Sequence, residues 1–295
     1  MIDLHIHTNY SDGVLSPKEV IEEALKNNIH TISITDHDTI DAYTNEELFN
    51  YANKVGIKII PGVEISTKYK GIGIHILGYN FDINNKKLKE KLNILRNARH
   101  EYLYDVSIKL KELGYSINTE KLNKIEAVTK AHIAQDIIKN ESNKNLLIEE
   151  FRHIPSKGEF IETIMNENCP AYVKKETITP NEVVKLIKKS GGKVILAHPI
   201  AYQYEDDLTD NDILNLIKES KVDGIETNYI YIDRFNHKIN NIDKWNKIAL
   251  DNNLITTIGS DFHGYDNIHP KIGLIDEKIN LSNEKINEII EKLSN

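Results

Sequence analysis

The sequence predicts an α/β protein in which a barrel-like domain of seven strand–helix steps is interrupted by an inserted helical subdomain. Two observations lead to this fold class. Segments with strand character alternate with helical segments at both ends of the chain, as expected for a parallel sheet with crossover helices. A long central stretch is instead helical, polar and rich in Lys, Glu and Asn.

The N-terminal part carries the first strand–helix steps. Ser16-Pro17-Lys18-Glu19 predicts a helix start, because it combines an N-cap serine, a proline at the first helical position and an acid at the third. A second helix is expected around residues 44–55. The expected strands of this part cover residues 2–7, 31–35, 57–65 and 72–79.

The alternation breaks after the fourth strand. Apolar residues at helical spacing predict a helix over residues 88–113, which Gly114 ends, and two shorter helices over 130–139 and 145–151. Strand–helix alternation resumes at Thr179, the N-cap of another helix. The remaining strands are expected at residues 193–197, 224–227 and 254–260. We therefore expect a discontinuous barrel of residues 1–80 and 176–295 and an inserted subdomain of residues 81–175.

Composition excludes several classes of protein. The chain has 37 basic and 45 acidic residues and no block of Lys or Arg, which argues against tight binding of long nucleic acid. A single cysteine, Cys169, excludes an intramolecular disulfide and a Cys-rich zinc site. Neither a secretory signal nor an apolar run long enough to span a bilayer is visible in the sequence, so we expect a soluble cytoplasmic protein without a membrane partner. The sequence does not indicate its oligomeric state.

Imidazoles and carboxylates recur near the ends of the expected strands. Alternation puts His5 and His7 on one face of the first strand, and parallel α/β barrels gather such side chains at the C-terminal ends of their strands. Imidazole and carboxylate are the ligands that hold Mn, Fe or Zn. The sequence therefore predicts a metallohydrolase with more than one divalent cation. The remaining candidate ligands are Asp12, His37, Glu64, His75, His198, Asp261 and His263.

Five further histidines lack this context. They do not follow expected strands at the same end, and we assign them to surface or structural roles. This set comprises His30, His100, His153, His237 and His269.

The motifs that carry these side chains resemble those of the polymerase-and-histidinol-phosphatase (PHP) family. They are His5-Ile6-His7-Thr8 with Ser11-Asp12-Gly13, Thr35-Asp36-His37-Asp38, Pro61-Gly62-Val63-Glu64, Ala197-His198-Pro199 and Ser260-Asp261-Phe262-His263. The segment from Ile74 to Tyr79, which contains His75, is similar to a further family segment. The resemblance implies a distorted seven-stranded (β/α)7 barrel with two or three metal ions, of which Mn is the expected metal and Fe or Zn are alternatives.

The resemblance also implies how the ligands divide among the metals. His5, His7, Glu64 and Asp261 would hold the first metal, and Asp12, His37 and His263 the second. Glu64 would bridge to a third metal held with His75 and His198.

Clustered divalent cations favour hydrolysis of a phosphoester. They lower the pKa of bound water and neutralise phosphoryl oxygens, so a metal-bridging hydroxide is the expected nucleophile. No Gly-rich phosphate loop, dinucleotide fingerprint or Gly-x-Ser-x-Gly elbow competes for this role. A His or Lys is expected to assist the leaving oxygen, and the sequence does not identify it.

Three further segments indicate which branch of the family the chain resembles. The segments around Lys130-Ala131-His132 and Pro170-Ala171-Tyr172, together with the Gly224–Asn228 strand, resemble the nucleotide branch. This branch comprises phosphatases that remove the 5′-phosphate of nucleoside 3′,5′-bisphosphates and 5′→3′ exoribonucleases of short RNA, and its insertion covers the metal centre. Lys130, His132 and Tyr172 are the expected substrate contacts, with Lys130 and His132 as catalytic assistants. Lys130 stands where Arg is usual and lacks its two-pronged contact. Glu226 is a partner of the ligands or part of the pocket wall.

Three functions are open at this point. The first is a phosphoesterase acting on a small phosphorylated nucleotide, such as a nucleoside 3′,5′-bisphosphate or AMP, or on a short oligonucleotide. The second is a phosphatase for another small monoester, such as histidinol phosphate, against which the insertion weighs. The third is a non-catalytic binding module, which is disfavoured because every ligand position holds a competent residue.

Overall fold

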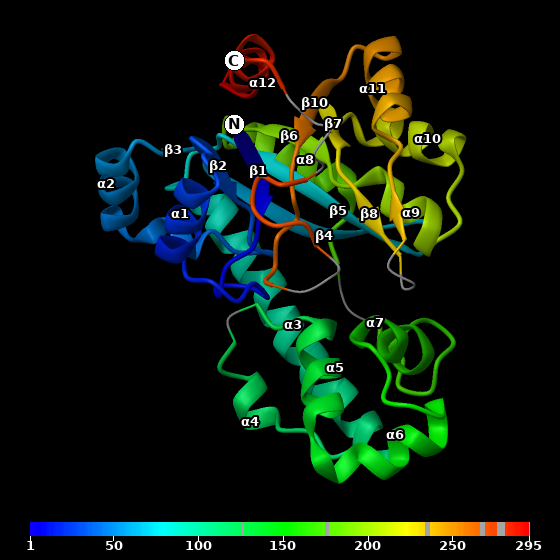
Figure 1. Ribbon diagram of the computed structural model, residues 1–295. Helices are drawn as coiled ribbons and strands as arrows, with labels where there is room; N and C mark the ends of the chain where they lie inside the picture. Colours follow the sequence, from blue (N-terminus) through cyan, green and yellow to red (C-terminus); the bar gives the residue numbers. More distant parts are fainter. Residues whose placement is uncertain (126, 175–176, 234–236, 266–268, 276–280, 295) are drawn as a thin grey trace. The chain divides into compact units, whose positions relative to one another are not determined.

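The computed structural model describes residues 1–125, 127–174, 177–233, 237–265, 269–275 and 281–294. The chain forms two compact units, one of Met1–Leu92 with Ile178–Asn295 and the other of Asn93–Thr177 (Figure 1). The mixed α/β class is confirmed. The predicted subdomain at residues 81–175 and its position over the active site stay predictions.

Strands occur in the first unit, where they alternate with helices (Figure 1). The strands are β1 (Ile2–Ile6), β2 (Thr31–Ile34), β3 (Lys58–Ile59), β4 (Gly62–Tyr69), β5 (Ile72–Tyr79), β6 (Lys193–Leu196), β7 (Gly224–Asn228), β8 (Tyr231–Ile232), β9 (Lys238–Ile239) and β10 (Ile255–Ile258). The helices are α1 (Pro17–Lys26), α2 (Glu46–Val55), α8 (Pro180–Lys189), α9 (Pro199–Glu205), α10 (Asp210–Ser220), α11 (Ile242–Asp251) and α12 (Asn283–Ser294). Capping boxes begin α1 at Ser16 and α8 at Thr179, as their sequences predict.

The main strands form two sheets, one in the order β1-β2-β3 and the other in the order β10-β7-β6-β5-β4. The sheets meet through two single parallel bridges, one between Ile6 and Phe262 and the other between His37 and Glu64. Among the described residues this arrangement is not one closed, continuously paired barrel. The seven-stranded (β/α)7 barrel therefore stays a prediction.

One strand departs from the expected parallel sheet. β5 runs antiparallel to both β4 and β6. The reason is local, because only Lys70 and Gly71 separate Tyr69 from Ile72, and a parallel crossover needs a dozen residues or more. Lys70 and Gly71 both have positive φ, 49° and 94°, as a two-residue hairpin turn of type I′ requires. The expected strand over residues 57–65 is also divided, into β3 and β4.

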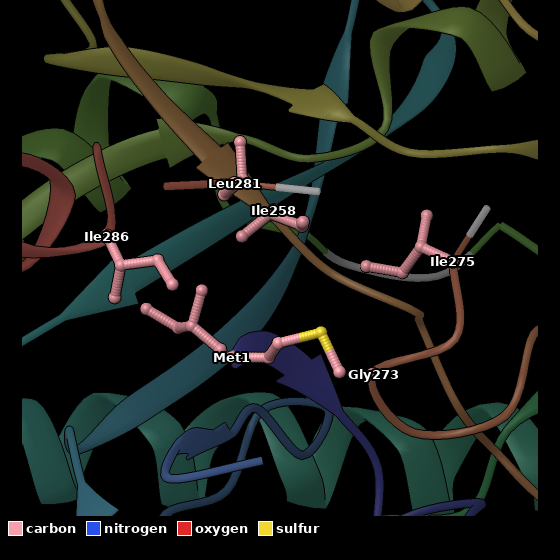
Figure 2. A pocket seen from close by; sticks show the side chains of 7 residues that line it. Met1, Ile258, Gly273, Ile275, Leu281 and Ile286 are labelled. Carbon is pink, nitrogen blue, oxygen red and sulfur yellow. The ribbon is translucent and has the colours of Figure 1, made fainter. Parts of the chain in front are cut away.

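The core of the first unit packs the strands against the C-terminal helix. Leu4 of β1 and Ile258 of β10 belong to one buried cluster with Ile289 and Leu293 of α12. A small apolar pocket opens beside this cluster and is lined by side chains that include Met1, as Figure 2 shows. Its lining consists of apolar side chains and Gly273.

The second unit is helical and has its own core. α3 (Lys86–Glu112) begins in the first unit, and the unit also contains the helices α4 (Thr119–Leu122), α5 (Lys130–Lys139), α6 (Lys144–Phe151) and α7 (Lys157–Phe160). Val106 and Leu110 of α3 share a buried cluster with Ile133 and Ile137 of α5. No helix in the described ranges combines the length and apolar character needed to cross a bilayer.

Tyr43 joins the two sheets near one of their seams. Its buried hydroxyl donates to the carbonyl of Ile34 in β2 and accepts from the N–H groups of Ile34 and of Gly62 in β4. Because Tyr43→Phe leaves these buried groups without their partner, we expect it to lower the free energy of unfolding by about 1–3 kcal/mol. Urea denaturation measures this change.

The control for Tyr43→Phe is Tyr69→Phe. The Tyr69 hydroxyl makes an exposed hydrogen bond to Glu219, so its loss is expected to change stability by less than about 0.5 kcal/mol. Equal stabilities for the two variants would contradict the role of Tyr43 at the seam.

Candidate metal centre

β1 and the residue that follows it carry the first two candidate ligands. Strand alternation puts His5 and His7 on one face, and both side chains are fully buried. Their Nε2 atoms lie 3.2 Å apart. The shared strand therefore brings two imidazole nitrogens to one point.

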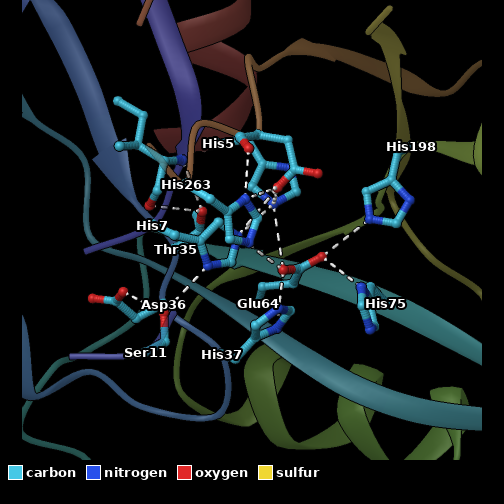
Figure 3. Close-up of polar contacts among 12 residues, drawn as sticks. His5, His7, Ser11, Thr35, Asp36, His37, Glu64, His75, His198 and His263 are labelled. Atoms are coloured by element: carbon cyan, nitrogen blue, oxygen red, sulfur yellow. Dashed lines mark hydrogen bonds and ion pairs between the residues drawn. The ribbon is translucent and has the colours of Figure 1, made fainter. Parts of the chain in front are cut away.

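Glu64 of β4 lies at the middle of the cluster, as Figure 3 shows. Its Oε2 atom lies 3.4 Å from His5 Nε2, 3.1 Å from His7 Nε2 and 3.1 Å from His37 Nδ1. Its Oε1 atom faces the other way, 3.0 Å from His75 Nδ1 and 3.2 Å from His198 Nε2. The two oxygens of one carboxylate thus divide the surrounding imidazoles into two sets, which is the arrangement that a bridging ligand requires.

Asp261, in the segment after β10, contacts the imidazoles that face Glu64 Oε2. Its Oδ1 atom lies 3.2 Å from the Nε2 atoms of both His5 and His7. Asp261 has φ of 53° and His198 has φ of 23°. Backbone strain of this kind costs about 1–3 kcal/mol and persists where the surrounding structure requires it. Both residues are therefore held in place by the fold around the cluster.

Asp12, on a loop after β1, contacts two further imidazoles. Its Oδ2 atom lies 3.7 Å from His37 Nε2, and its Oδ1 atom lies 3.3 Å from His263 Nε2. The buried Asp36 carboxylate fixes this loop, because it accepts hydrogen bonds from Thr8 N–H, Thr8 O–H and Ser11 O–H. Asp36 is thus a support of the loop that carries Asp12.

Glu226 of β7 orients two of the candidate ligands. Its Oε1 and Oε2 atoms lie 3.1 and 3.2 Å from His5 Nδ1, and Oε2 accepts a hydrogen bond from the backbone N–H of His198 at 2.9 Å. A carboxylate on the outer ring nitrogen fixes the tautomer and directs Nε2 of His5 inward. Gly259 leaves the space for this pair, because a Cβ there would lie 2.2 Å from His5 Cβ and 2.4 Å from Glu226 Oε1.

Opposite charges within the cluster offset the effect of burial on the pKa values of its carboxylates and imidazoles. Burial alone would raise the pKa of Asp261, but the neighbouring His5 holds it well below its usual range. Burial would lower the pKa of His7, but hydrogen bonds to Asp261 and Glu64 raise it to about 10. Burial holds the pKa of His37 well below its usual range, so this imidazole keeps a lone pair for a ligand bond. The carboxylates therefore favour positive charge at their centre, from a proton or from a metal cation.

The donor atoms fit divalent cations. A cation with bonds of about 2.1 Å places neighbouring ligand atoms about 3.0–3.4 Å apart, and the contacts among His5, His7, Glu64 and Asp261 are 3.1–3.4 Å. Asp12 Oδ1 and His37 Nδ1 are buried without a hydrogen bond, although each lies close to other donors of the cluster. Atoms that face one another without hydrogen-bond geometry are suited to a shared cation.

The remaining predicted ligands join the same cluster. Ligand-capable atoms within 4.8 Å of one another form the groups His5-His7-Glu64-Asp261, His7-Asp12-His37-His263 and His37-Glu64-His75, and His198 contacts Glu64 directly. The structure thus brings every predicted ligand together, while their assignment to individual metals stays a prediction.

The predicted substrate contacts lie in the second unit. Lys130 is the first residue of α5, and its Nζ atom donates to Asn166 Oδ1. His132 forms a capping box with Thr129, whose N–H donates to His132 Nδ1. The backbone carbonyl of Tyr172 accepts from Lys109 Nζ. These contacts join residues of the second unit, and the role of the three residues toward substrate stays a prediction.

Sequence reasoning missed two residues of the centre. The hydroxyl of Tyr229, directly after β7, lies 3.4 Å from Asp261 Oδ2. The Nε2 atom of His269 lies 4.0 Å from the same oxygen, so the structure places His269 beside the candidate ligands, while its assignment to a surface or structural role stays a prediction. The signal for His269 was its short separation along the chain from Asp261 and His263.

A mixed α/β fold that gathers imidazoles around a bridging carboxylate defines a metal-dependent hydrolase. The model of the PHP domain family matches residues 3–192, and the chain belongs to this family. It is accordingly a metal-dependent phosphoesterase.

Curated relatives and solved structures resemble the chain over most of its length. A 5′-3′ exoribonuclease of Haemophilus influenzae is 29% identical, over 93% of this chain and 95% of that protein. A 3′,5′-nucleoside bisphosphate phosphatase of Chromobacterium violaceum is 26% identical, over 89% of this chain and 87% of that protein. The structure of an amidohydrolase from the same organism matches with a TM-score of 0.77 at 24% identity, covering 99% of this chain and 96% of that one, and shows the fold alone.

Metal loading is expected to stabilise the folded chain. Cations that bind the assembled cluster and not the unfolded chain add about 2.7 kcal/mol when they are present at 100 times their Kd. Thermal melts of the protein with excess Mn²⁺ and with EDTA measure the difference. We expect a higher Tm with Mn²⁺, and superimposable melts would contradict a metal centre.

Proposed function

We propose that this protein hydrolyses the 5′-phosphate of small nucleotides, such as a nucleoside 3′,5′-bisphosphate or AMP, or of short 5′-phosphorylated RNA. The observation that carries this proposal is the bridging position of Glu64, whose two oxygens face separate sets of imidazoles. The names of two relatives, an exoribonuclease and a nucleoside bisphosphate phosphatase, support the substrate class.

The proposed ligands divide among three cations, with Glu64 shared between two of them. His5, His7, Glu64 and Asp261 would hold one cation, Asp12, His37 and His263 a second, and Glu64, His75 and His198 a third. We propose Mn, with Fe or Zn as alternatives, since imidazole and carboxylate donors suit all of them. Bound cations would neutralise phosphoryl oxygens and lower the pKa of water.

The chain's own side chains give this centre its rigidity. Glu226 holds His5 through its outer ring nitrogen, and Tyr202 accepts the backbone N–H of His75 at 2.9 Å. Buried supports of this kind typically change metal affinity about 10–100-fold when they are removed. The substrate phosphate therefore meets ligands whose orientation is set before it binds.

The inserted subdomain is proposed to supply substrate contacts. The N–H of Thr129 donates to His132 Nδ1, so in the neutral ring the proton is on Nε2, which is then a donor suited to a phosphate oxygen. Lys130 adds a cation at the N-terminus of α5, where backbone N–H groups also favour anions. Tyr172 offers an aromatic ring for contact with a base.

An assay panel tests the proposed substrate class. Phosphate release is measured from adenosine 3′,5′-bisphosphate, AMP, short 5′-phosphorylated RNA and histidinol phosphate, each with Mn²⁺ and with EDTA. We expect metal-dependent release from the nucleotide substrates. Release from histidinol phosphate alone would replace this proposal with the small-monoester phosphatase, and a folded, metal-loaded protein without turnover would favour the binding module.

Asp261→Asn tests the ligand role separately from folding. Asparagine tolerates the positive φ at this position, so the fold is expected to persist, while loss of the anionic ligand lowers turnover by more than about 1000-fold, equivalent to about 4 kcal/mol. Steady-state kinetics and circular dichroism measure the two effects. Activity near that of the unaltered protein would contradict the assignment.

A further inference from the structure

The two oxygens of the Asp261 carboxylate face different groups. The Oδ1 atom lies 3.2 Å from the Nε2 atoms of both His5 and His7. The Oδ2 atom accepts a long hydrogen bond from the Tyr229 hydroxyl at 3.4 Å, and His269 Nε2 lies beyond hydrogen-bond distance from it at 4.0 Å. Oδ1 is thus the oxygen that faces the proposed ligands, and Oδ2 is the oxygen that the Tyr229 hydroxyl contacts.

Tyr229 lies between two of the proposed ligands. It directly follows β7 and is 8% exposed. Its hydroxyl has Asp261 as its hydrogen-bond partner among the described residues, and its ring lies against the ring of His198, with centroids 5.5 Å apart. A buried tyrosine hydroxyl usually has such a partner. Because the proposed function assigns Asp261 and His198 to different cations, Tyr229 contacts ligands of two metal positions.

A carboxylate that holds a cation needs a partner that fixes its orientation. The terminal torsion of an aspartate is broad and roughly two-fold, so the carboxylate can rotate and exchange its oxygens, and it can hold a cation through one oxygen or through both. A hydrogen bond to the outer oxygen removes this freedom. The Tyr229 hydroxyl supplies such a bond to Asp261, whose backbone is itself held at a positive φ of 53°.

We propose that Tyr229 is a positioning residue of the metal centre, whose hydroxyl holds Oδ2 of Asp261 so that Oδ1 alone faces a cation. Tyr229 is not itself a ligand in this arrangement, because its hydroxyl is a neutral donor at pH 7. Removing the hydrogen-bond partner of a metal ligand typically weakens metal binding about 10–100-fold. This inference rests on the metal centre of the proposed function and not on its substrate.

Tyr229→Phe tests this role, because it removes the hydroxyl and keeps the ring against His198. Metal-free protein is titrated with Co²⁺ by calorimetry, and the visible absorption of bound Co²⁺ reports the number and geometry of its ligands. In the variant we expect one Co²⁺ equivalent to bind about 10–100-fold more weakly. We also expect a changed absorption spectrum, since Asp261 is then free to bind through both oxygens.

Tyr204→Phe is the matched control. Tyr204 is 50% exposed and stacks on Tyr231, and neither residue is among the proposed ligands. We expect this variant to keep the Co²⁺ affinities and the spectrum of the unaltered protein. Circular dichroism and thermal melts of the metal-free proteins measure the effect of each substitution on folding.

The outcomes separate the role of Tyr229 from the metal centre. Absence of Co²⁺ binding by the folded, unaltered protein would overturn both. Unchanged affinities or an unchanged spectrum in Tyr229→Phe would overturn the positioning role alone, because loss of a merely structural contact lowers stability and leaves the ligands of the metal as they were. The same changes in Tyr204→Phe would also overturn it. A weakened equivalent with a changed spectrum in Tyr229→Phe alone would support it.

Discussion

The contact of Glu64 with its surrounding imidazoles is the interaction on which the rest of the first unit depends. Glu64 is almost fully buried, and a buried carboxylate is stable only when charges and hydrogen bonds compensate it. Its partners come from β1, from the end of β2, from β5 and from the end of β6. Because β1 and β2 belong to one sheet and β5 and β6 to the other, this one side chain joins the two sheets.

The seam of the sheets and the metal centre are the same place. One bridge between the sheets is formed by His37 and Glu64 themselves, and the other pairs Ile6 with Phe262, which stand beside His7 and Asp261. A cation held here would join the two sheets where their backbone pairing is limited to single bridges. Metal binding at the candidate centre would therefore stabilise the junction of the two sheets.

Much of the fold, and the gathering of the candidate ligands at one place, could be predicted from the sequence because both depend on local patterns. Capping residues such as Ser16 and Thr179 determined two helix starts, and strand alternation put His5 and His7 on one face. The reversed direction of β5 was not predicted, although the two-residue turn at Lys70 and Gly71 indicates it. His269 was missed because its neighbours depend on the path of the chain after Asp261, which no periodicity describes.

The supporting carboxylates show a second limit of sequence reasoning. Asp36 occurs in a motif with His37, yet its carboxylate accepts hydrogen bonds from Thr8 and Ser11 instead of facing the centre. Glu226 lies on a strand that the sequence predicts, but its contact with His5 depends on Gly259, a residue of another segment. Whether an acid holds a cation or a loop is decided by tertiary contacts that composition and spacing do not contain.

The reversal of β5 also explains why His75 occupies the interior of a strand. Its carbonyl accepts from the N–H of Ala197, so it lies level with the carboxyl end of β6, and the hairpin of β4 and β5 continues past this level to Lys70. Lengthening the turn would extend that projection and leave every ligand in register. A single residue inserted just before Glu64 would instead turn its carboxylate to the opposite face of the sheet. The length of the turn between β4 and β5 can therefore vary, whereas the register of β4 at Glu64 cannot change without moving its carboxylate away from the cluster.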